Sequence, residues 1–282
     1  MSAVLNGPIN GPVLNGPVFA DVPQPKFQPG PAGTHITIRG LTKYFAGWPL
    51  YENFDLDIPK HAIVSVFGPN GCGKSTLINM IAGLIPVDGG EILFDGKQRK
   101  DTKIGYVFQN YREAMFPWMR TIDNIAYPLK LEGRSKAEVD RRMAELVASF
   151  DVKFDLKRYP YELSGGQQQT ASIMRALAPN PEVLFLDEPF SALDFEMTLF
   201  IREKLQEVFM KTGTTMLLVS HDLEEAVYLA DQVLLLTKRP TRVAEILRYG
   251  DARPRTIETL SEPSFVAMKK LSLEIFQREV RR

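Results

Sequence analysis

Cysteine is nearly absent from this sequence, which holds one residue of that type, Cys72, among 282. A single thiol cannot form a disulfide within the chain, and no group of cysteines and histidines has the spacing of a zinc site. This scarcity excludes a small secreted domain held together by disulfides and is typical of proteins from a reducing compartment. We expect the chain to work in the cytosol.

Long apolar runs and a net charge are also lacking. No run approaches the roughly 20 apolar residues that cross a bilayer, and no basic region followed by an apolar core stands at the start. We therefore expect neither a membrane span nor a secretory signal. The 34 basic residues balance the 34 acidic ones, so no overall field attracts nucleic acid or an anionic membrane. With 44% hydrophobic and 24% charged residues, the composition is that of a soluble globular protein.

Proline and glycine crowd the first 33 residues. The triplet Asn-Gly-Pro occurs at 6–8, 10–12 and 15–17, and further prolines follow up to Pro31. Such a segment has few side chains to bury and many turn formers. We predict that residues 1–33 form a disordered extension, with a docking tail for a partner as the alternative.

Residues 68–76, Gly-Pro-Asn-Gly-Cys-Gly-Lys-Ser-Thr, match the phosphate-loop pattern G-x-x-x-x-G-K-[ST]. An apolar run at 62–67 predicts a buried strand before the loop, and 77–82 predicts a helix after it. Glycines let successive N–H groups point at phosphate oxygens, and the helix N-terminus adds its positive dipole end. We expect Lys74 to contact the β and γ phosphates of a nucleotide and Ser75 to bind Mg²⁺. The predicted nucleotide-binding residues of the loop are Gly68, Pro69, Asn70, Gly71, Cys72, Gly73, Lys74, Ser75 and Thr76.

The remaining pattern predicts an α/β protein. Alternating residues at 35–39 and 54–58 indicate half-buried antiparallel strands, and Tyr44, Phe45 and Trp48 are expected in a loop between them, where an aromatic ring can stack on a base. Strands that alternate with helices imply a parallel sheet covered on both faces. The strands predicted after the phosphate loop are 91–94, 104–108, 182–188, 214–220 and 232–237, with helices at 196–211 and 222–230.

A helical insertion of about residues 110–164 divides the predicted core. Residues 135–138, Ser-Lys-Ala-Glu, form a capping box, and apolar side chains then recur at spacings of three and four up to Phe150. The last stretch, 261–282, predicts one amphipathic helix. We expect that helix to pack back on the core rather than to bind a partner.

Polar residues follow the predicted strands directly. Because ligands bind at the carboxyl ends of parallel strands, Gln109, Asp187 and His221 are expected to meet at the phosphate site. Asp187 is predicted to hold Mg²⁺ through water, since this ion keeps several waters and takes few carboxylates. Glu188 is predicted to deprotonate the attacking water. Gln109 would contact metal and water, and His221 the γ phosphate. The predicted catalytic residues are thus Lys74, Gln109, Glu188 and His221.

A second anion site is predicted at 163–167, Leu-Ser-Gly-Gly-Gln, which precedes a helix at 168–178 and offers a hydroxyl and N–H groups at its N-terminus. This pentapeptide is the signature of ATP-binding cassette (ABC) ATPases. Five further motifs agree in order and spacing, so the sequence resembles that family from about residue 36 to 247. The signature adds Ser164, Gly165, Gly166 and Gln167 to the predicted ATP-binding residues.

The resemblance implies an α/β P-loop NTPase of the ABC type, with a mixed, mostly parallel sheet core, an antiparallel β subdomain and an inserted α-helical subdomain. The cassette would span residues 34–253, followed by a tail and helix at 254–282. It further implies that Phe45 stacks on adenine, with Tyr44 as its rival, and that Asp194 of the D-loop at 191–194 lies at the ATP site. His221 takes the place of the switch histidine.

Family membership also implies partners. Two cassettes, as a homodimer or a pair of different chains, would enclose ATP head to tail, and the region 109–118 would receive a membrane permease. The lack of spans favours an importer subunit at the cytoplasmic face of the inner membrane, served indirectly by a periplasmic solute-binding protein. The runs 116–118 and 220–231 and the Pro254-Arg255 pair are most similar to the nitrate, sulfonate and taurine importer branch, so a small anion is the expected solute.

Two departures and several alternatives accompany this interpretation. Thr170 stands where the family usually has arginine, at a position expected on the helix surface, and residues 111–115 differ from the importer branch. An importer for an unrelated solute stays open. A soluble cassette acting on ribosomes or DNA usually has two cassettes or basic arms, and the neutral charge argues against nucleic acid. A regulatory module without turnover is disfavoured by Glu188 and His221.

Overall fold

The computed structural model describes residues 33–191 and 193–281. The predicted disordered extension, residues 1–33, lies outside the described residues apart from Gly33.

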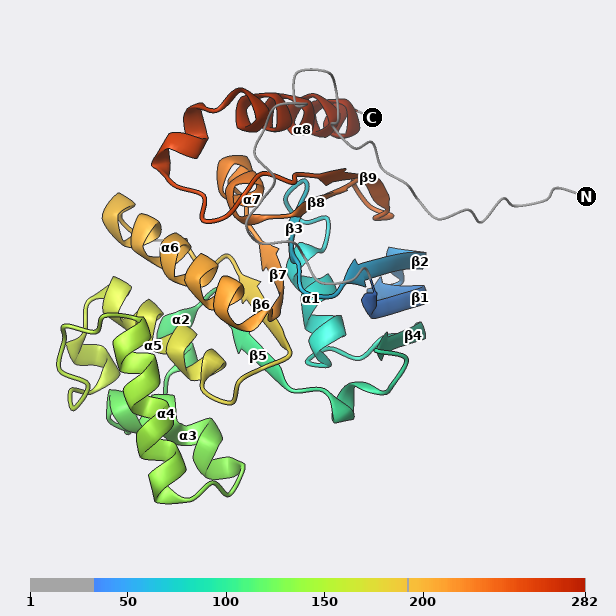
Figure 1. Ribbon diagram of the computed structural model, residues 1–282. Coiled ribbons are helices and arrows are strands. Elements are labelled where there is room, and N and C mark those ends of the chain that lie inside the picture. Colours follow the sequence, from blue (N-terminus) through green and yellow to red (C-terminus); the bar gives the residue numbers. More distant parts are fainter. Residues whose placement is uncertain (1–32, 192, 282) are drawn as a thin grey trace, which may run out of the picture.

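A six-stranded sheet forms the centre of the molecule (Figure 1). Its first five strands are parallel, as predicted, whereas the last strand runs antiparallel at the edge. That edge strand was not predicted, because its residues are mostly only half-buried and show little alternation. In spatial order the strands are β5 (Ile104–Val107), β6 (Val183–Asp187), β7 (Thr215–Val219), β3 (Ile63–Phe67), β8 (Gln232–Leu236) and β9 (Val243–Arg248).

A separate three-stranded antiparallel sheet has the order β2 (Trp48–Pro59), β1 (Thr34–Phe45) and β4 (Gly89–Phe94). The prediction of a loop around Phe45 and Trp48 is wrong, because these two residues pair with each other at the ends of β1 and β2. Only Ala46 and Gly47 turn the chain, with φ of 49° and 82°. Positive φ at both central residues is the geometry that joins twisted strands in a tight hairpin.

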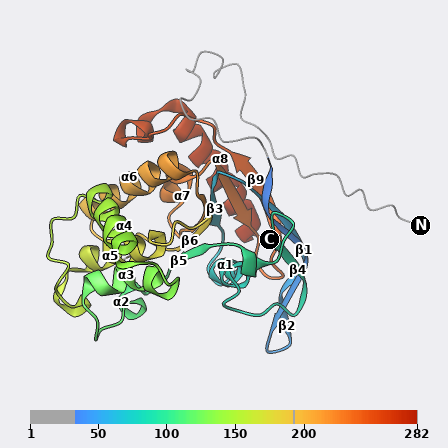
Figure 2. The ribbon, with the colours of Figure 1, turned by 60° about the horizontal axis from the view of Figure 1, so that its bottom comes forward.

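The central sheet is covered on both faces, as predicted (Figures 1 and 2). Side chains of β6 alternate between two hydrophobic clusters, with Leu184 and Leu186 in one and Val183 and Phe185 in the other. The first cluster includes residues of the four helices α5 (Gly165–Leu177), α6 (Phe195–Thr212), α7 (Leu223–Leu229) and α8 (Pro263–Arg281). The second cluster joins α1 (Lys74–Ala82) to the antiparallel sheet.

Helices between β5 and β6 gather away from the antiparallel sheet in both views (Figures 1 and 2). Ser135 caps α4 in the predicted capping box with Glu138. The apolar side of that helix, including Met143 and Leu146, is buried. These helices are α2 (Tyr111–Ala114), α3 (Thr121–Leu131), α4 (Lys136–Ser149) and the α5 already named. Short 3-10 turns lie at Arg99–Asp101, Pro160–Glu162 and Ile257–Ser261.

The last helix, α8, packs back on the core as predicted. Phe265, Met268 and Ile275 are buried, and the ring of Phe276 lies 5.1 Å from that of Phe67, at the end of β3. In the part of the chain that the structure describes, no helix combines the length and the apolar character needed to span a bilayer.

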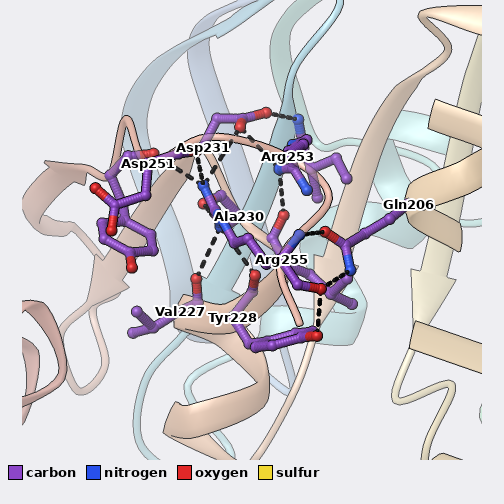
Figure 3. Close-up of polar contacts among 11 residues, drawn as sticks. Gln206, Val227, Tyr228, Ala230, Asp231, Asp251, Arg253 and Arg255 are labelled. Atoms are coloured by element: carbon purple, nitrogen blue, oxygen red, sulfur yellow. Dashed lines mark hydrogen bonds and ion pairs between the residues drawn. The ribbon is translucent and has the colours of Figure 1, made fainter. Parts of the chain in front are cut away.

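The side chain of Arg255 extends from the C-terminal tail to the carbonyls at the end of α7 (Figure 3). Its side chain is fully buried, and Nη1 donates to the carbonyls of Val227, Tyr228 and Ala230 at 3.2, 2.9 and 2.7 Å. The last carbonyls of a helix have no partner within it, so the guanidinium supplies donors to a helix end that would otherwise be buried unpaired. Burial lowers the pKa of Arg255 to about 10.

Arg253 reinforces the same helix end. Its Nη2 donates to the carbonyl of Leu229 and to Asp231 Oδ1, the latter at 2.7 Å. The other oxygen of Asp231 accepts from the N–H of Ile63, at the start of β3. The tail, α7 and the central strand of the sheet are thereby tied together.

Candidate active site

The phosphate loop requires glycine for two separate reasons. Gly71 and Gly73 have φ of 74° and 97°, a conformation that side chains rarely adopt. A Cβ on Gly73 would also lie 2.9 Å from Leu50 Cδ2, and one on Gly68 would lie 3.0 Å from Leu236 Cβ. Conformation and close packing thus explain why the loop is glycine-rich.

Lys74 lies over the loop that contains it. Its side chain is largely buried, and Nζ donates to the carbonyls of Gly68 at 2.9 Å and Pro69 at 3.2 Å. The ammonium group is therefore held against the first two residues of the loop. Of the other loop residues, Gly68 and Cys72 are buried, Asn70 and Gly71 are exposed, and Pro69, Gly73, Ser75 and Thr76 lie between these extremes.

Asp187, at the end of β6, faces the first turn of α1. Ser75 Oγ donates to Asp187 Oδ1 at 2.8 Å, and Tyr106 OH lies 3.5 Å from Oδ2. Burial raises the pKa of Asp187, and the hydrogen bond from Ser75 opposes that shift. A hydroxyl and one carboxylate are the donor set that suits Mg²⁺, which takes few protein ligands and completes its shell with water and phosphate oxygens.

The carboxylate of Glu188 contacts two other predicted catalytic residues, Gln109 and His221. Gln109 Nε2 donates to Glu188 Oε2 at 2.8 Å, and His221 Nδ1 lies 3.2 Å from the same oxygen. The three residues come from the ends of different strands, β5, β6 and β7, so the sheet edge brings them together as expected. Which roles they perform is a prediction that the geometry permits.

The backbone of Glu188 is in the left-handed region, with φ of 47°. This conformation costs about 1–3 kcal/mol for a residue other than glycine and persists where the surroundings hold it. Here the N–H of Glu188 donates to the carbonyl of Val219 at 2.9 Å, and its carbonyl accepts from the Ser191 N–H and hydroxyl. The turn gives consecutive carboxylates different partners, Ser75 for Asp187 and Gln109 for Glu188.

The signature residues lie at the start of α5, which begins three residues earlier than predicted because Ser164 caps it. Ser164 and Gln167 exchange capping hydrogen bonds at 3.3 and 3.0 Å. A Cβ on Gly165 would lie 2.8 Å from Tyr111 OH, and one on Gly166 would lie 2.7 Å from Met197 Cγ. These glycines thus permit close contacts with α2 and α6.

Thr170 was expected on the helix surface, and that expectation is wrong. Its side chain is buried, and Oγ1 donates to the carbonyl of Gly166 at 2.9 Å. The helix α5 contacts α2, α3 and β5, so little of its circumference faces solvent. The threonine hydroxyl is therefore satisfied by the first turn of its own helix and does not face solvent.

Two residues to which the resemblance gives a role at the ATP site, Phe45 and Asp194, are exposed. Phe45 is 45% exposed beside Tyr44 at 41%, and Lys43 Nζ lies 5.5 Å from the Phe45 ring centroid. Asp194 caps α6 by accepting from the Met197 N–H at 2.8 Å. The stacking of Phe45 on adenine and the contact of Asp194 with ATP stay predictions.

Sequence reasoning missed residues that reach the loop or Asp187 from distant segments. Tyr106 OH donates to Asn79 Oδ1 at 2.7 Å beside Asp187. Tyr51, Arg239 and Thr241 donate to loop carbonyls. No local motif marks these four side chains, because only the assembled sheets bring three of them to the loop and Tyr106 to Asp187.

Comparison with known proteins agrees with this geometry. The family model described as ABC transporter matches residues 51–191. A taurine import ATP-binding protein of Escherichia coli is 40% identical over 259 residues, which cover 86% of this chain and 98% of that protein. The chain belongs to the ABC transporter family.

Other members of the ABC transporter family are similar over shorter stretches. A sulfate/thiosulfate import ATP-binding protein of Neisseria meningitidis is 41% identical over 210 residues, and the match spans 71% of this chain but 58% of that relative. Two dimeric structures of an ATP-binding cassette, one of them a post-hydrolysis state bound to ADP and Pi, have TM-scores of 0.67 with 29% and 30% identity. Each match covers 76% of this chain and 98% of the other. The predicted family and its α/β P-loop NTPase fold of the ABC type are confirmed.

Proposed function

We propose that this ABC protein is the ATP-hydrolysing subunit of an importer for a small anion. The observation that carries the proposal is the carboxylate of Glu188. It is contacted by Gln109 and His221 and follows Asp187, which is bonded to the phosphate-loop hydroxyl of Ser75. A base, a polar orienting group and a phosphate cradle thus share one sheet edge.

Phosphoryl transfer depends mainly on positioning and charge stabilisation. The loop and Lys74 hold the β and γ phosphates, and Phe45 stacks on adenine. Glu188 accepts a proton from the attacking water, Gln109 orients that water, and His221 hydrogen-bonds the γ phosphate. Held at Ser75 and Asp187 with Gln109 nearby, Mg²⁺ would neutralise charge on the β and γ phosphates.

The working unit is a head-to-tail pair of cassettes. The signature, Ser164 to Gln167, contacts α2 and α6 within its own chain and presents an exposed hydroxyl at a helix N-terminus. We propose that this end, together with Asp194, closes over ATP held by the second cassette. Two ATP molecules then join the cassettes, and hydrolysis separates them.

A membrane permease is the partner that couples hydrolysis to uptake. The chain would sit peripherally on the cytoplasmic face of the inner membrane and receive the permease near residues 109–118, where Trp118 is 73% exposed. The similar proteins are named for taurine and for sulfate or thiosulfate. A sulfonate, taurine or nitrate is therefore the proposed class of solute, delivered by a periplasmic binding protein.

Phosphate release by the purified full chain tests the enzymatic part. We expect turnover that needs Mg²⁺ and is lost in Lys74→Ala together with tight ATP binding, because the ammonium group that contacts the phosphates is removed. Unchanged ATP affinity in Lys74→Ala would contradict the loop assignment. Lys60→Ala, before β3, is the matched control and should hydrolyse ATP normally.

Uptake by cells of the source organism that lack the chain tests the transport part. Radiolabelled taurine and sulfate, and nitrate by its depletion from the medium, serve as probes. We expect loss of uptake of one of these anions, restored by the intact chain but not by Lys74→Ala. Normal uptake of all three would overturn the small-anion proposal without touching ATP hydrolysis.

A further inference from the structure

Three consecutive carbonyls of the phosphate loop are held by side chains from outside it. They belong to residues 71–73, and each accepts from a different side chain, one in β2 and two in the turn between β8 and β9. Arg239 Nε donates to Gly71 O at 2.7 Å, Thr241 Oγ1 to Cys72 O at 2.6 Å, and Tyr51 OH to Gly73 O at 3.0 Å. We call Tyr51, Arg239 and Thr241 the collar.

The collar acts on peptide planes. A trans peptide is planar and its C=O and N–H point in opposite directions, so a donor that fixes a carbonyl also fixes the N–H of the next residue. Thr241 thereby sets the N–H of Gly73, and Tyr51 sets that of Lys74. Arg239 sets the N–H of Cys72, which closes the turn by donating to Pro69 O at 3.2 Å.

Backbone hydrogen bonds hold the segments that carry the collar residues. Arg239 and Thr241 lie in the turn between β8 and β9, where the N–H of Thr237 donates to the carbonyl of Arg242 at 3.0 Å. The N–H of Thr241 donates to the carbonyl of Leu50 at 2.8 Å, which joins that turn to β2 next to Tyr51. Thr241 and Tyr51 are fully buried, whereas Arg239 is exposed.

We propose that the collar residues position the phosphate loop for nucleotide binding by holding its carbonyls outward. This keeps the turn closed at Cys72 and lets the N–H groups of Gly73 and Lys74 face the phosphates. The proposal rests on the proposed binding of ATP at this loop. Positive φ at Gly71 and Gly73 makes such a concave array of N–H groups possible, but glycine is also the residue that most readily leaves it. The collar supplies the restraint that the glycines lack.

A comparison of Arg239→Ala with Lys238→Ala in the full chain distinguishes the positioning of the loop from the mere loss of one positive charge. Both remove one exposed cation from the same turn, but only Arg239 donates to the loop. We expect Arg239→Ala to raise the Kd for ATP about three- to tenfold, the range of one hydrogen bond. The Kd for ADP should rise equally, because the loop holds phosphates that both nucleotides share. Lys238→Ala should bind both nucleotides like the unaltered chain.

In steady-state kinetics we expect Arg239→Ala to raise the KM for ATP and to leave kcat at saturation unchanged, because the collar touches no reacting atom. Thr241→Val, which keeps the shape of the side chain, should likewise raise KM and leave kcat unchanged. Equal Kd values for Arg239→Ala and Lys238→Ala would overturn the proposal. Failure of the unaltered chain to bind ATP would instead overturn the proposed function.

Discussion

Glu188 is the residue at which several contacts of the site meet. Its left-handed backbone is held by Val219 and Ser191, and its side chain is contacted by Gln109 and His221. Strain in a non-glycine residue at the end of a strand points to function, since evolution keeps such conformations where a side chain must be aimed.

Glu188→Gln should therefore abolish most hydrolysis while ATP binding is retained. The amide keeps the size of the side chain but cannot accept the proton, so we expect phosphate release to fall at least about 100-fold, the lower range for a general base. The nucleotide-bound dimer should accumulate, because hydrolysis no longer separates it. Glu91→Gln, an exposed residue of β4, is the control. Only monomers by size-exclusion in Mg²⁺ and ATP would contradict the mechanism.

Cys72 leads to a prediction about thiol chemistry. The side chain is 1% exposed, and burial raises the pKa of its thiol. Only the thiolate attacks an alkylating reagent, so modification by iodoacetamide should be slow near neutral pH and should accelerate as the pH rises toward that raised pKa. Alkylation should block the nucleotide pocket, so ATP binding should fall in proportion to the label measured by mass spectrometry. Full ATPase activity after complete modification would refute this.

Single residues were predictable from sequence where a local motif carries them. The phosphate loop and the strand-terminal residues Gln109, Asp187 and His221 follow from patterns of a few positions. Thr170 was misplaced because a helix in contact with other elements on several sides leaves no reliable polar face in its sequence. Arg239 was missed because its contact with Gly71 spans 168 positions in the chain.

At the scale of elements, α7 shows how a short helix is held in place. It has seven residues, begins after the predicted switch histidine, and ends in carbonyls that Arg255 and Arg253 bind. Isolated helices of this length are not stable in water, so tertiary contacts must fix it. The tail that follows β9 therefore contributes to the placement of an element next to His221.

Arg255→Met should strongly destabilise the fold. Methionine fills similar volume without donors, so the buried carbonyls of α7 lose their partners, at about 1–3 kcal/mol for each unsatisfied group. We expect the free energy of unfolding to fall by at least about 3 kcal/mol, measured by urea denaturation. Arg248→Met, at an exposed position of β9, should change little. Equal denaturation midpoints for the two variants would show that the buried arginine network adds no net stability.

Elements were predicted well where burial is continuous and poorly at the periphery. The core strands read as apolar runs because both of their faces are covered. The edge strand β9 escaped prediction, and the hairpin of β1 and β2 was cut short at the aromatic residues. In both cases exposure weakens the apolar pattern, while the pairing partner that stabilises the strand lies elsewhere in the sequence.

At the scale of the whole molecule, the two predicted anion sites belong to different parts of the fold. The phosphate loop is set between β3 and α1, whereas the signature begins α5 and contacts α2 and α6. Figure 1 shows α5 among the helices of the insertion, apart from α1. A site that needs both sets of residues is then most simply completed by a second cassette, which is the arrangement proposed above.

The Ser164→Asp variant tests whether the signature of one cassette completes the ATP site of the other. Aspartate caps a helix about as well as serine, so α5 should keep its first turn and the fold should be intact. Its carboxylate would face the phosphates bound by the other cassette and repel them. In a Glu188→Gln background we therefore expect light scattering in Mg²⁺ and ATP to show monomers, with an unchanged Kd for ATP. Ser135→Asp, at the equivalent capping position of α4, should still dimerise. A stable dimer of the Ser164→Asp variant would contradict the proposal. If the signature closes the ATP site, a carboxylate at this position must repel the bound phosphates.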